Sequence, residues 1–79
     1  MAVEVRLFTT LREFLPPESI DGVYQYQMEG EKTIKELAAE LKLPFPHIHL
    51  IMINGEQGNL DSTFRDGDRV GFFPPVGGG

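Results

Sequence analysis

Hydrophobic and polar residues alternate in three stretches of the chain, with the period of two that is typical of β-strands with one buried face. Residues 3–7 and 69–73 alternate in this way near the two ends of the sequence. In the third stretch, residues 23–28, both tyrosines and the methionine fall on one face and the glutamines on the other. We therefore expect three strands here, and the first and the last can be neighbours in one sheet.

The clearest helix is predicted for residues 33–43. Thr33 and Glu36 have the spacing of a capping box, in which each side chain bonds a backbone N–H that the helix leaves free. Four apolar residues follow at helical spacing: Ile34, Leu37, Ala38 and Leu41. Pro44 and Pro46 then end the helix. We expect this apolar stripe to cover the sheet, because the chain offers no other helix of comparable length.

A central strand is predicted for residues 50–53, which are all apolar. They lead into Asn54-Gly55, a pair that favours the type I′ turn, so this strand should leave into a hairpin or tight loop. Asp66-Gly67 is predicted as the next such turn.

A short helical segment of one or two turns is predicted for residues 11–15, ended by Pro16 and Pro17. The expected order is therefore strand, short helix, strand, capped helix, strand, turns and strand. A sheet covered on one face by one main helix is an α+β architecture.

Length, charge and cysteine content limit the function classes. The 79 residues are enough for one domain with a small core, so a deep internal active site is not expected. The formal net charge of −5 repels phosphate backbones and makes nucleic acid an unfavourable partner. The sequence contains no cysteine, which excludes a disulfide frame, a thiolate metal site and a cysteine nucleophile.

Targeting and membrane signals are not evident in the sequence. Met1 is followed by a charged alternating stretch rather than by a basic and then an apolar region. No apolar segment approaches the roughly 18 to 20 residues that span a bilayer. We therefore expect a soluble cytoplasmic protein.

The C-terminal segment, residues 74–79, is expected to be an extended tail on a domain formed by residues 1–73. Pro74 and Pro75 end the strand ladder and stiffen the chain, and the glycines beyond them offer no side chain to obstruct a narrow passage. Six extended residues reach on the order of 20 Å. That reach could present the terminal carboxyl group of Gly79 inside another protein's active site. The alternative is a disordered tail without a function.

A free terminal carboxyl group needs activation before it can react. Its usual pKa of about 3.3 to 3.7 leaves it ionised at neutral pH, and a carboxylate is a poor electrophile. A mixed anhydride with phosphate or AMP would be the simplest activated form.

The sequence resembles the small subunits of molybdopterin synthases, which belong to the ubiquitin-like sulfur-carrier family with a β-grasp fold. The resemblance spans nearly the whole chain and rests on the order and spacing of short motifs in residues 3–8, 11–13, 52–55, 66–70, 72–76 and 78–79. Gly77 departs from the family, whose members often have alanine at this place. The resemblance implies a mixed sheet covered by one main helix.

The resemblance also implies a mechanism and a set of partners. A ubiquitin-activating-like enzyme would use ATP and magnesium to adenylate Gly79, and a sulfur donor would convert the adenylate to a thiocarboxylate. The tail, with Gly77 and Gly78 allowing its passage, would enter the large synthase subunit and give its sulfur to a pterin precursor of molybdopterin. The chain itself would bind no cofactor and have no active site of its own.

Three other functions stay open at this point. The chain could carry sulfur for thiazole or another metabolite, or it could be a ubiquitin-like modifier whose Gly79 forms an amide with a lysine of a target protein. It could also be an interaction domain with an inert tail.

The residues expected to contact partners lie on the tail, at its root and on the first and last strands. They are Phe73, Pro74, Pro75, Val76, Arg6 and Arg69. If the first and last strands are adjacent, Arg6, Gly71 and Phe73 share the face opposite Val5, Val70 and Phe72, and this outer face docks the partners. The alternative is that Phe73 packs under its own loop and the arginines pair with Glu4 or Asp68.

His47 and His49 are two residues apart and could form a metal pair. Neither cysteine nor an evident third ligand accompanies them, so they are interpreted as solvated or structural histidines.

Overall fold

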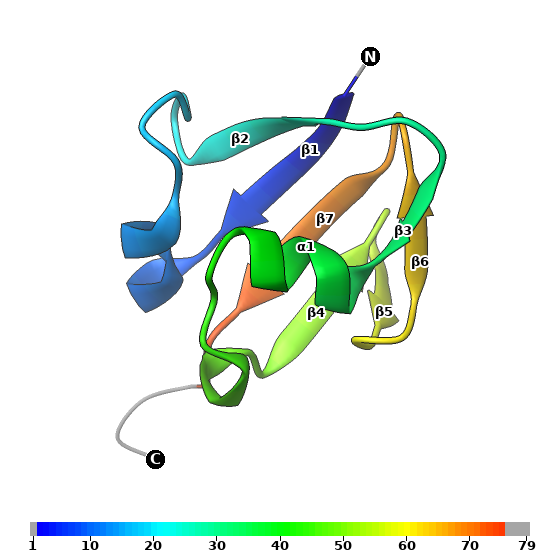
Figure 1. Cartoon of the computed structure of the whole chain (residues 1–79). Coiled ribbons are helices and arrows are strands. Elements are labelled where there is room, and N and C mark those ends of the chain that lie inside the picture. The colour runs from blue at the N-terminus through cyan, green and yellow to red at the C-terminus, as the bar shows by residue number, and fades with distance from the viewer. Residues whose placement is uncertain (1, 76–79) are drawn as a thin grey trace.

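The computed structural model describes residues 2–75, which form a five-stranded sheet and a separate pair of short strands (Figure 1). The sheet has the strand order β2-β1-β7-β4-β5. Its strands are β1 (Ala2–Leu7), β2 (Val23–Gln27), β4 (Leu50–Ile53), β5 (Glu56–Gly58) and β7 (Arg69–Phe73). β1 and β7 run parallel, and the other neighbours are antiparallel. The sheet is therefore mixed, and the first and last strands are neighbours at its centre, as predicted.

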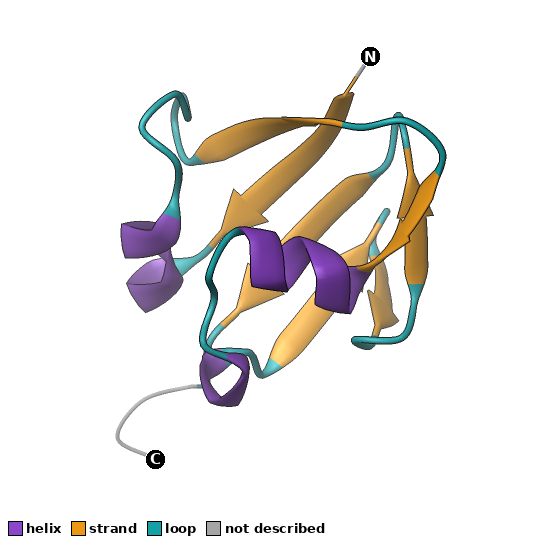
Figure 2. Cartoon of the chain, in the orientation of Figure 1, coloured by secondary structure: helices purple, strands orange, loops and turns teal. Residues whose placement is uncertain are grey.

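One main helix, α1 (Ile34–Glu40), lies across one face of this sheet (Figure 2). The connections contain two short 3₁₀ helices, η1 (Thr9–Phe14) and η2 (Phe45–His47). β3 (Glu31–Thr33) and β6 (Thr63–Arg65) pair with each other beside α1. This is a β-grasp arrangement. Within residues 2–75, no helix has the length and apolar character that a membrane span requires.

The core lies between α1 and the face of the sheet that we call the inner face. The alternating apolar residues of β1 and β7 point into it, and they are packed with apolar residues of α1 and of the connections. The buried residues are Val3, Val5, Leu7, Leu11, Tyr26, Ile34, Leu37, Ala38, Leu43, Ile51, Phe64, Val70 and Phe72. The outer face of the sheet is the one without a covering helix.

The capping box of α1 is present as predicted. The Thr33 hydroxyl accepts a hydrogen bond from the Glu36 N–H at 3.2 Å, and the Glu36 carboxylate accepts one from the Thr33 N–H at 3.0 Å. The helix ends at Glu40, whereas the prediction extended it to residue 43. Lys42 takes a positive φ of 61°, and the N–H groups of Lys42 and Leu43 bond back to carbonyls of the last turn. This C-cap turns the chain early and carries the Leu43 side chain into the core.

The two predicted turns differ. Asn54 and Gly55 both have positive φ, 52° and 85°, so the type I′ turn joining β4 to β5 is confirmed. At Asp66-Gly67 only the glycine has positive φ, and the turn joins β6 to β7, which do not pair. The prediction of a second turn of the same type is therefore wrong, because β6 leaves the main sheet to pair with β3.

A hydrogen-bonded contact joins α1 to β2. The Tyr26 hydroxyl donates to a Glu40 carboxylate oxygen at 2.6 Å, and the Lys32 ammonium donates to the same oxygen at 3.0 Å. The bond from Tyr26, and after it the bond and charge of Lys32, hold the pKa of the Glu40 carboxyl below its ordinary value of 4.5. A carboxyl whose pKa is lower in the folded state contributes stability above its unfolded pKa, and this contribution disappears as the pH falls through the folded value.

Tyr26→Phe is expected to lower the free energy of unfolding by about 1 kcal/mol at pH 7, because Glu40 is half-exposed and the bond is partly screened. At an acidic pH below the folded pKa of Glu40 the loss should be smaller, since the carboxylate that the hydroxyl stabilises is then protonated. Urea unfolding of both proteins at the two pH values measures the difference. An equal loss at both values would assign the effect to ring packing instead.

Candidate functional site

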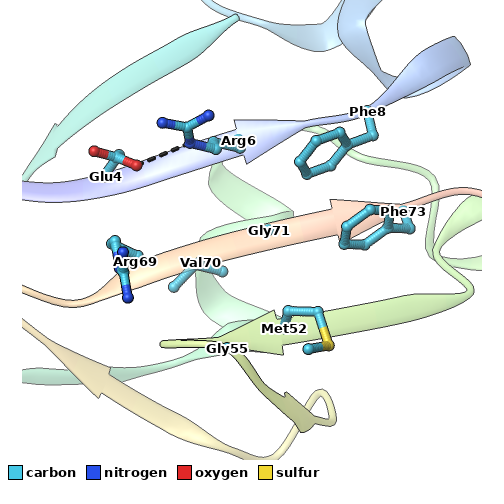
Figure 3. A pocket seen from close by; sticks show the side chains of 9 residues that line it. All are labelled: Glu4, Arg6, Phe8, Met52, Gly55, Arg69, Val70, Gly71 and Phe73. Atoms are coloured by element: carbon cyan, nitrogen blue, oxygen red, sulfur yellow. Dashed lines mark hydrogen bonds and ion pairs between the residues drawn. The ribbon is translucent and has the colours of Figure 1, made fainter.

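The outer face of β7 is the centre of the candidate site. β7 lies between β1 and β4, with Arg6 opposite Gly71 on one side and Met52 opposite Gly71 on the other. Because side chains alternate along a strand, the buried Val70 and Phe72 point to the core, and the residues between them point outward. The predicted placement of Arg6, Gly71 and Phe73 on one face is what the structure shows (Figure 3).

Two aromatic rings form the apolar part of this face. Phe8 follows β1, and its N–H donates to the carbonyl of Phe72 at 3.2 Å, which places it beside the end of β7. Its ring stacks on that of Phe73, with ring centroids 4.2 Å apart and planes inclined by 4°. Phe73 therefore packs on a neighbouring strand end rather than under its own loop. Both rings are half-buried, so each keeps a surface that a partner can contact.

A shallow groove runs along the outer face where Gly71 supplies no side chain. A Cβ atom at this position would come within 3.3 Å of the Phe8 ring and 3.6 Å of the Phe73 ring. We call the hollow the outer groove; its lining residues are Glu4, Arg6, Phe8, Met52, Gly55, Arg69, Val70, Gly71 and Phe73. The rings lie at one end and the charged side chains at the other (Figure 3).

The two arginines of the outer groove differ in their electrostatic partners. The Arg6 Nε donates to a carboxylate oxygen of Glu4 at 2.8 Å, so this charge is largely balanced. Arg69 forms no ion pair with any of residues 2–75. The carboxylate of Asp68 instead accepts from the Asn54 amide and from the Arg65 N–H. The structure therefore confirms the alternative pairing for Arg6 and not for Arg69, whose exposed guanidinium can donate hydrogen bonds to a partner's carboxylate.

The tail leaves the sheet beside the stacked rings. The carbonyl of Phe73 accepts a hydrogen bond from the His49 N–H at 2.8 Å, which fixes the last residue of β7 against the start of β4. Pro74 and Pro75 follow, and neither has an N–H to continue the ladder. The other predicted tail residues, Val76, Gly77, Gly78 and Gly79, lie outside the described residues.

The two histidines do not form a site in the structure. His47 belongs to η2, and His49 lies in the link before β4, so they do not share one strand. Both are exposed, and residues 2–75 contain no group of three or more histidine, aspartate or glutamate side chains placed to hold a metal ion.

Sequence reasoning found part of the outer groove and missed the rest. Arg6, Arg69 and Phe73 are brought together, while Phe8 and Met52 were not predicted as site residues. The alternation that placed Arg6 on the outer face could have been continued to Phe8. No comparable signal marks Met52, because its strand is apolar on both faces and the buried face cannot be identified from the sequence.

Comparison with known proteins shows which family the chain belongs to. The family model described as Mut7-C ubiquitin matches residues 1–77. The chain belongs to this family. Across the full length of both chains it is 27% identical to small archaeal modifier protein 3 of Haloferax volcanii.

Two solved structures extend the comparison. The crystal structure of small archaeal modifier protein 1 of Haloferax volcanii matches with 25% identity and a TM-score of 0.69, over 94% of this chain and 97% of the other. A complex of subunits 1 and 2 of molybdopterin-converting factor from Helicobacter pylori matches with 27% identity and a TM-score of 0.61, over the whole of both chains. The predicted ubiquitin-like β-grasp fold is thereby confirmed, and the chain is similar both to protein modifiers and to a molybdopterin-converting factor.

Proposed function

We propose that this chain is a carrier whose Gly79 carboxyl group is adenylated and converted to a thiocarboxylate, which donates its sulfur to a pterin precursor of molybdopterin. A ubiquitin-activating-like enzyme supplies the adenylation with ATP and magnesium, and a separate donor supplies the sulfur. The similarity to a molybdopterin-converting factor solved with its subunits 1 and 2 supports a large synthase subunit as the acceptor of the tail.

The observation that carries the proposal is the position of the tail root. Pro74 follows directly on Phe73, whose ring is half of the stacked pair in the outer groove. A partner that binds the groove is therefore held beside the point where the tail leaves the sheet. This arrangement provides docking and delivery at one place, which is what a carrier without catalytic groups of its own requires.

The chemistry of the outer groove defines the partner's surface. Its ring end would bind an apolar side chain, and Arg69 at the other end would bind a carboxylate. A carrier meets its activating enzyme and its acceptor in succession, so both would present this combination of apolar and acidic groups.

A protein modifier is the second candidate, because one relative that matches over its whole length is a small archaeal modifier protein. In this case the activated Gly79 would form an amide with a lysine of a target protein. Adenylation is common to both candidates, and they diverge only in whether sulfur or an amine receives the acyl group.

Intact-mass spectrometry separates the two functions. The full chain is incubated with ATP, magnesium, an adenylating enzyme from the same source and a sulfur donor, and a variant that lacks Gly79 is the control. We expect a mass increase equal to the replacement of one oxygen by sulfur in the full chain, and none in the deletion variant. Adding the large synthase subunit and the pterin precursor should return the chain to its original mass.

Three results would contradict the proposal as stated. Amide-linked conjugates in place of a thiocarboxylate would favour the modifier, and a thiocarboxylate that persists with the synthase subunit present would indicate another sulfur acceptor. An unchanged mass, with an adenylating enzyme active on a known carrier, would favour an inert tail.

A further inference from the structure

One edge of the main sheet is formed by β2 and the other by β5 (Figure 1). Two hydrogen bonds show how the backbone of β1 is oriented: the Glu4 N–H donates to the carbonyl of Asp68, and the Phe8 N–H to that of Phe72. Even-numbered residues of β1 therefore bond toward β7, and odd-numbered residues bond toward β2. Val3 and Val5 are the odd-numbered residues of β1 that lie opposite residues of β2.

The backbone of β2 alternates in the same way. Val3 and Val5 are opposite Tyr26 and Tyr24, so the peptide groups of the two tyrosines bond to β1. The N–H and C=O groups of Gln25 therefore point away from the sheet, and those of Gln27 do the same. Within residues 2–75 these groups have no hydrogen-bond partner on that side.

This edge lacks the features by which proteins usually protect a free strand. β2 has five residues, and none of them is charged or a proline. The opposite edge, β5, has only three residues and begins with Glu56. The exposed backbone of β2 is therefore the better template for an added strand.

Ile20 marks where such a strand would begin. Its N–H and C=O exchange hydrogen bonds with Val23 at 2.9 and 3.0 Å. Ile20 therefore already lies beside β2, in the place that the first residue of an added sixth strand would take. Its side chain is 73% exposed, the highest value among the exposed large hydrophobic residues of the described chain. This pairing ends at Ile20, and the outward-facing backbone groups of Gln25 and Gln27, farther along β2, have no partner in the described part of the chain.

The charge beside this edge is negative. A shallow groove along it is lined by Glu4, Arg6, Glu18, Ile20, Asp21, Val23 and Gln25. Arg6 is balanced by Glu4, and Glu18 and Asp21 form no ion pair among residues 2–75. The Arg12 guanidinium lies beside Gly22 and offsets part of the Asp21 charge, which leaves Glu18 as the carboxylate with no cation beside it. On the other face of the edge, the half-buried ring of Tyr24 offers an apolar surface.

A second copy of the chain fits this edge poorly. Antiparallel pairing of two β2 strands about Gln25 would place Asp21 of each copy opposite Glu29 of the other. Each chain also carries a formal net charge of −5, so the two copies repel each other.

We propose that β2 is a strand-addition site for an extended segment of a partner protein in which basic and apolar side chains alternate. Main-chain hydrogen bonds form with Gln25 and Gln27. The basic side chains lie on the groove side and face Glu18 and Asp21, and the apolar ones lie on the other face beside Tyr24. This site is separate from the tail root, and it does not depend on the sulfur-transfer function proposed above.

NMR titration of the full chain with two synthetic peptides tests this inference. One is acetyl-Lys-Val-Lys-Val-Lys-amide, and the other has the same backbone with glutamate in place of each lysine. We expect the lysine peptide to shift the amide signals of Gln25 and Gln27 and to slow their hydrogen exchange. The glutamate peptide should do neither, and added salt should weaken the binding of the lysine peptide.

Two edge variants supply a matched comparison. Gln25→Pro removes an N–H that makes no bond to β1, so the fold should tolerate it, and binding should weaken roughly tenfold because an added strand loses a hydrogen bond and meets the proline ring. Gln57→Pro makes the same change on the opposite edge of the sheet, and binding of the lysine peptide should be unchanged. The Asn54 N–H bonds to β7, so Met52, two residues earlier, also bonds toward β7, and the N–H of Gln57 opposite Met52 points away from the sheet. The double variant Glu18→Gln with Asp21→Asn leaves the backbone of β2 unchanged and removes two negative charges. It should weaken binding of the lysine peptide and not that of the glutamate peptide.

The inference would be overturned by any of four results. The lysine peptide could fail to bind at millimolar concentration, or both peptides could bind equally. The amide signals that change could be centred on Phe73 instead of β2. Finally, the chain could self-associate in a concentration-dependent way that Gln25→Pro abolishes. The last result would make a second copy the occupant of the edge.

Discussion

Replacing Phe72 with alanine is expected to remove about 3 to 5 kcal/mol from the free energy of unfolding. Phe72 is fully buried on the inner face of β7, opposite Leu7 of β1 and Ile51 of β4. A chain of this length has a total stability of only roughly 4 to 12 kcal/mol. The variant should therefore lose a large share of its stability, and urea unfolding followed by circular dichroism measures the loss.

Phe73→Ala is the matched comparison, because it removes the same side chain from the next residue of the same strand. Phe73 lies on the outer face and is half-buried against Phe8, so its removal leaves no closed cavity. We expect a loss of about 1 to 2 kcal/mol, made up of the stacking contact and part of the buried ring area. A loss as large as that of Phe72→Ala would show that the outer ring pair belongs to the core, and its availability to a partner would then be doubtful.

The strands and the main helix could be predicted because their sequence patterns have a direct structural cause. Residues 3–7 and 69–73 alternate because only one face of their sheet is covered, and the Thr33–Glu36 spacing marks where α1 begins. β3, β5 and β6 could not be predicted in this way. Each has three residues and makes a largely polar segment, so its strand conformation comes from pairing with a distant partner and not from its own pattern.

The outer groove depends on the registers of two strand pairs. Arg69 and Phe73 follow from the alternation of β7, but the approach of Phe8 to Phe73 requires the parallel pairing of β1 with β7 in one particular register. Met52 reaches the groove only because β4 pairs with β7 on the other side. Such registers are set by tertiary packing, and a single sequence does not contain them in readable form.

Binding to the adenylating enzyme should depend strongly on Phe73. Aromatic side chains at the centre of an interface often account for 2 kcal/mol or more, so Phe73→Ala is expected to weaken binding by roughly thirtyfold. Arg69→Glu should also weaken binding, and mainly at low salt, because Arg69 is exposed and its charge acts on the rate of association. The measurement is titration calorimetry at two salt concentrations with the enzyme that modifies Gly79.

Two controls separate docking at the outer groove from loss of folding. Gln57→Ala truncates an exposed side chain of β5 that does not line the outer groove, and should leave the affinity unchanged. Phe73→Leu keeps an apolar side chain beside Phe8 and should retain most of the affinity. Full binding by Phe73→Ala, together with the modest loss of stability expected for it, would show that the partner does not use the stacked rings. In that case the tail alone would have to carry recognition, and the position of its root beside the outer groove would have no functional meaning.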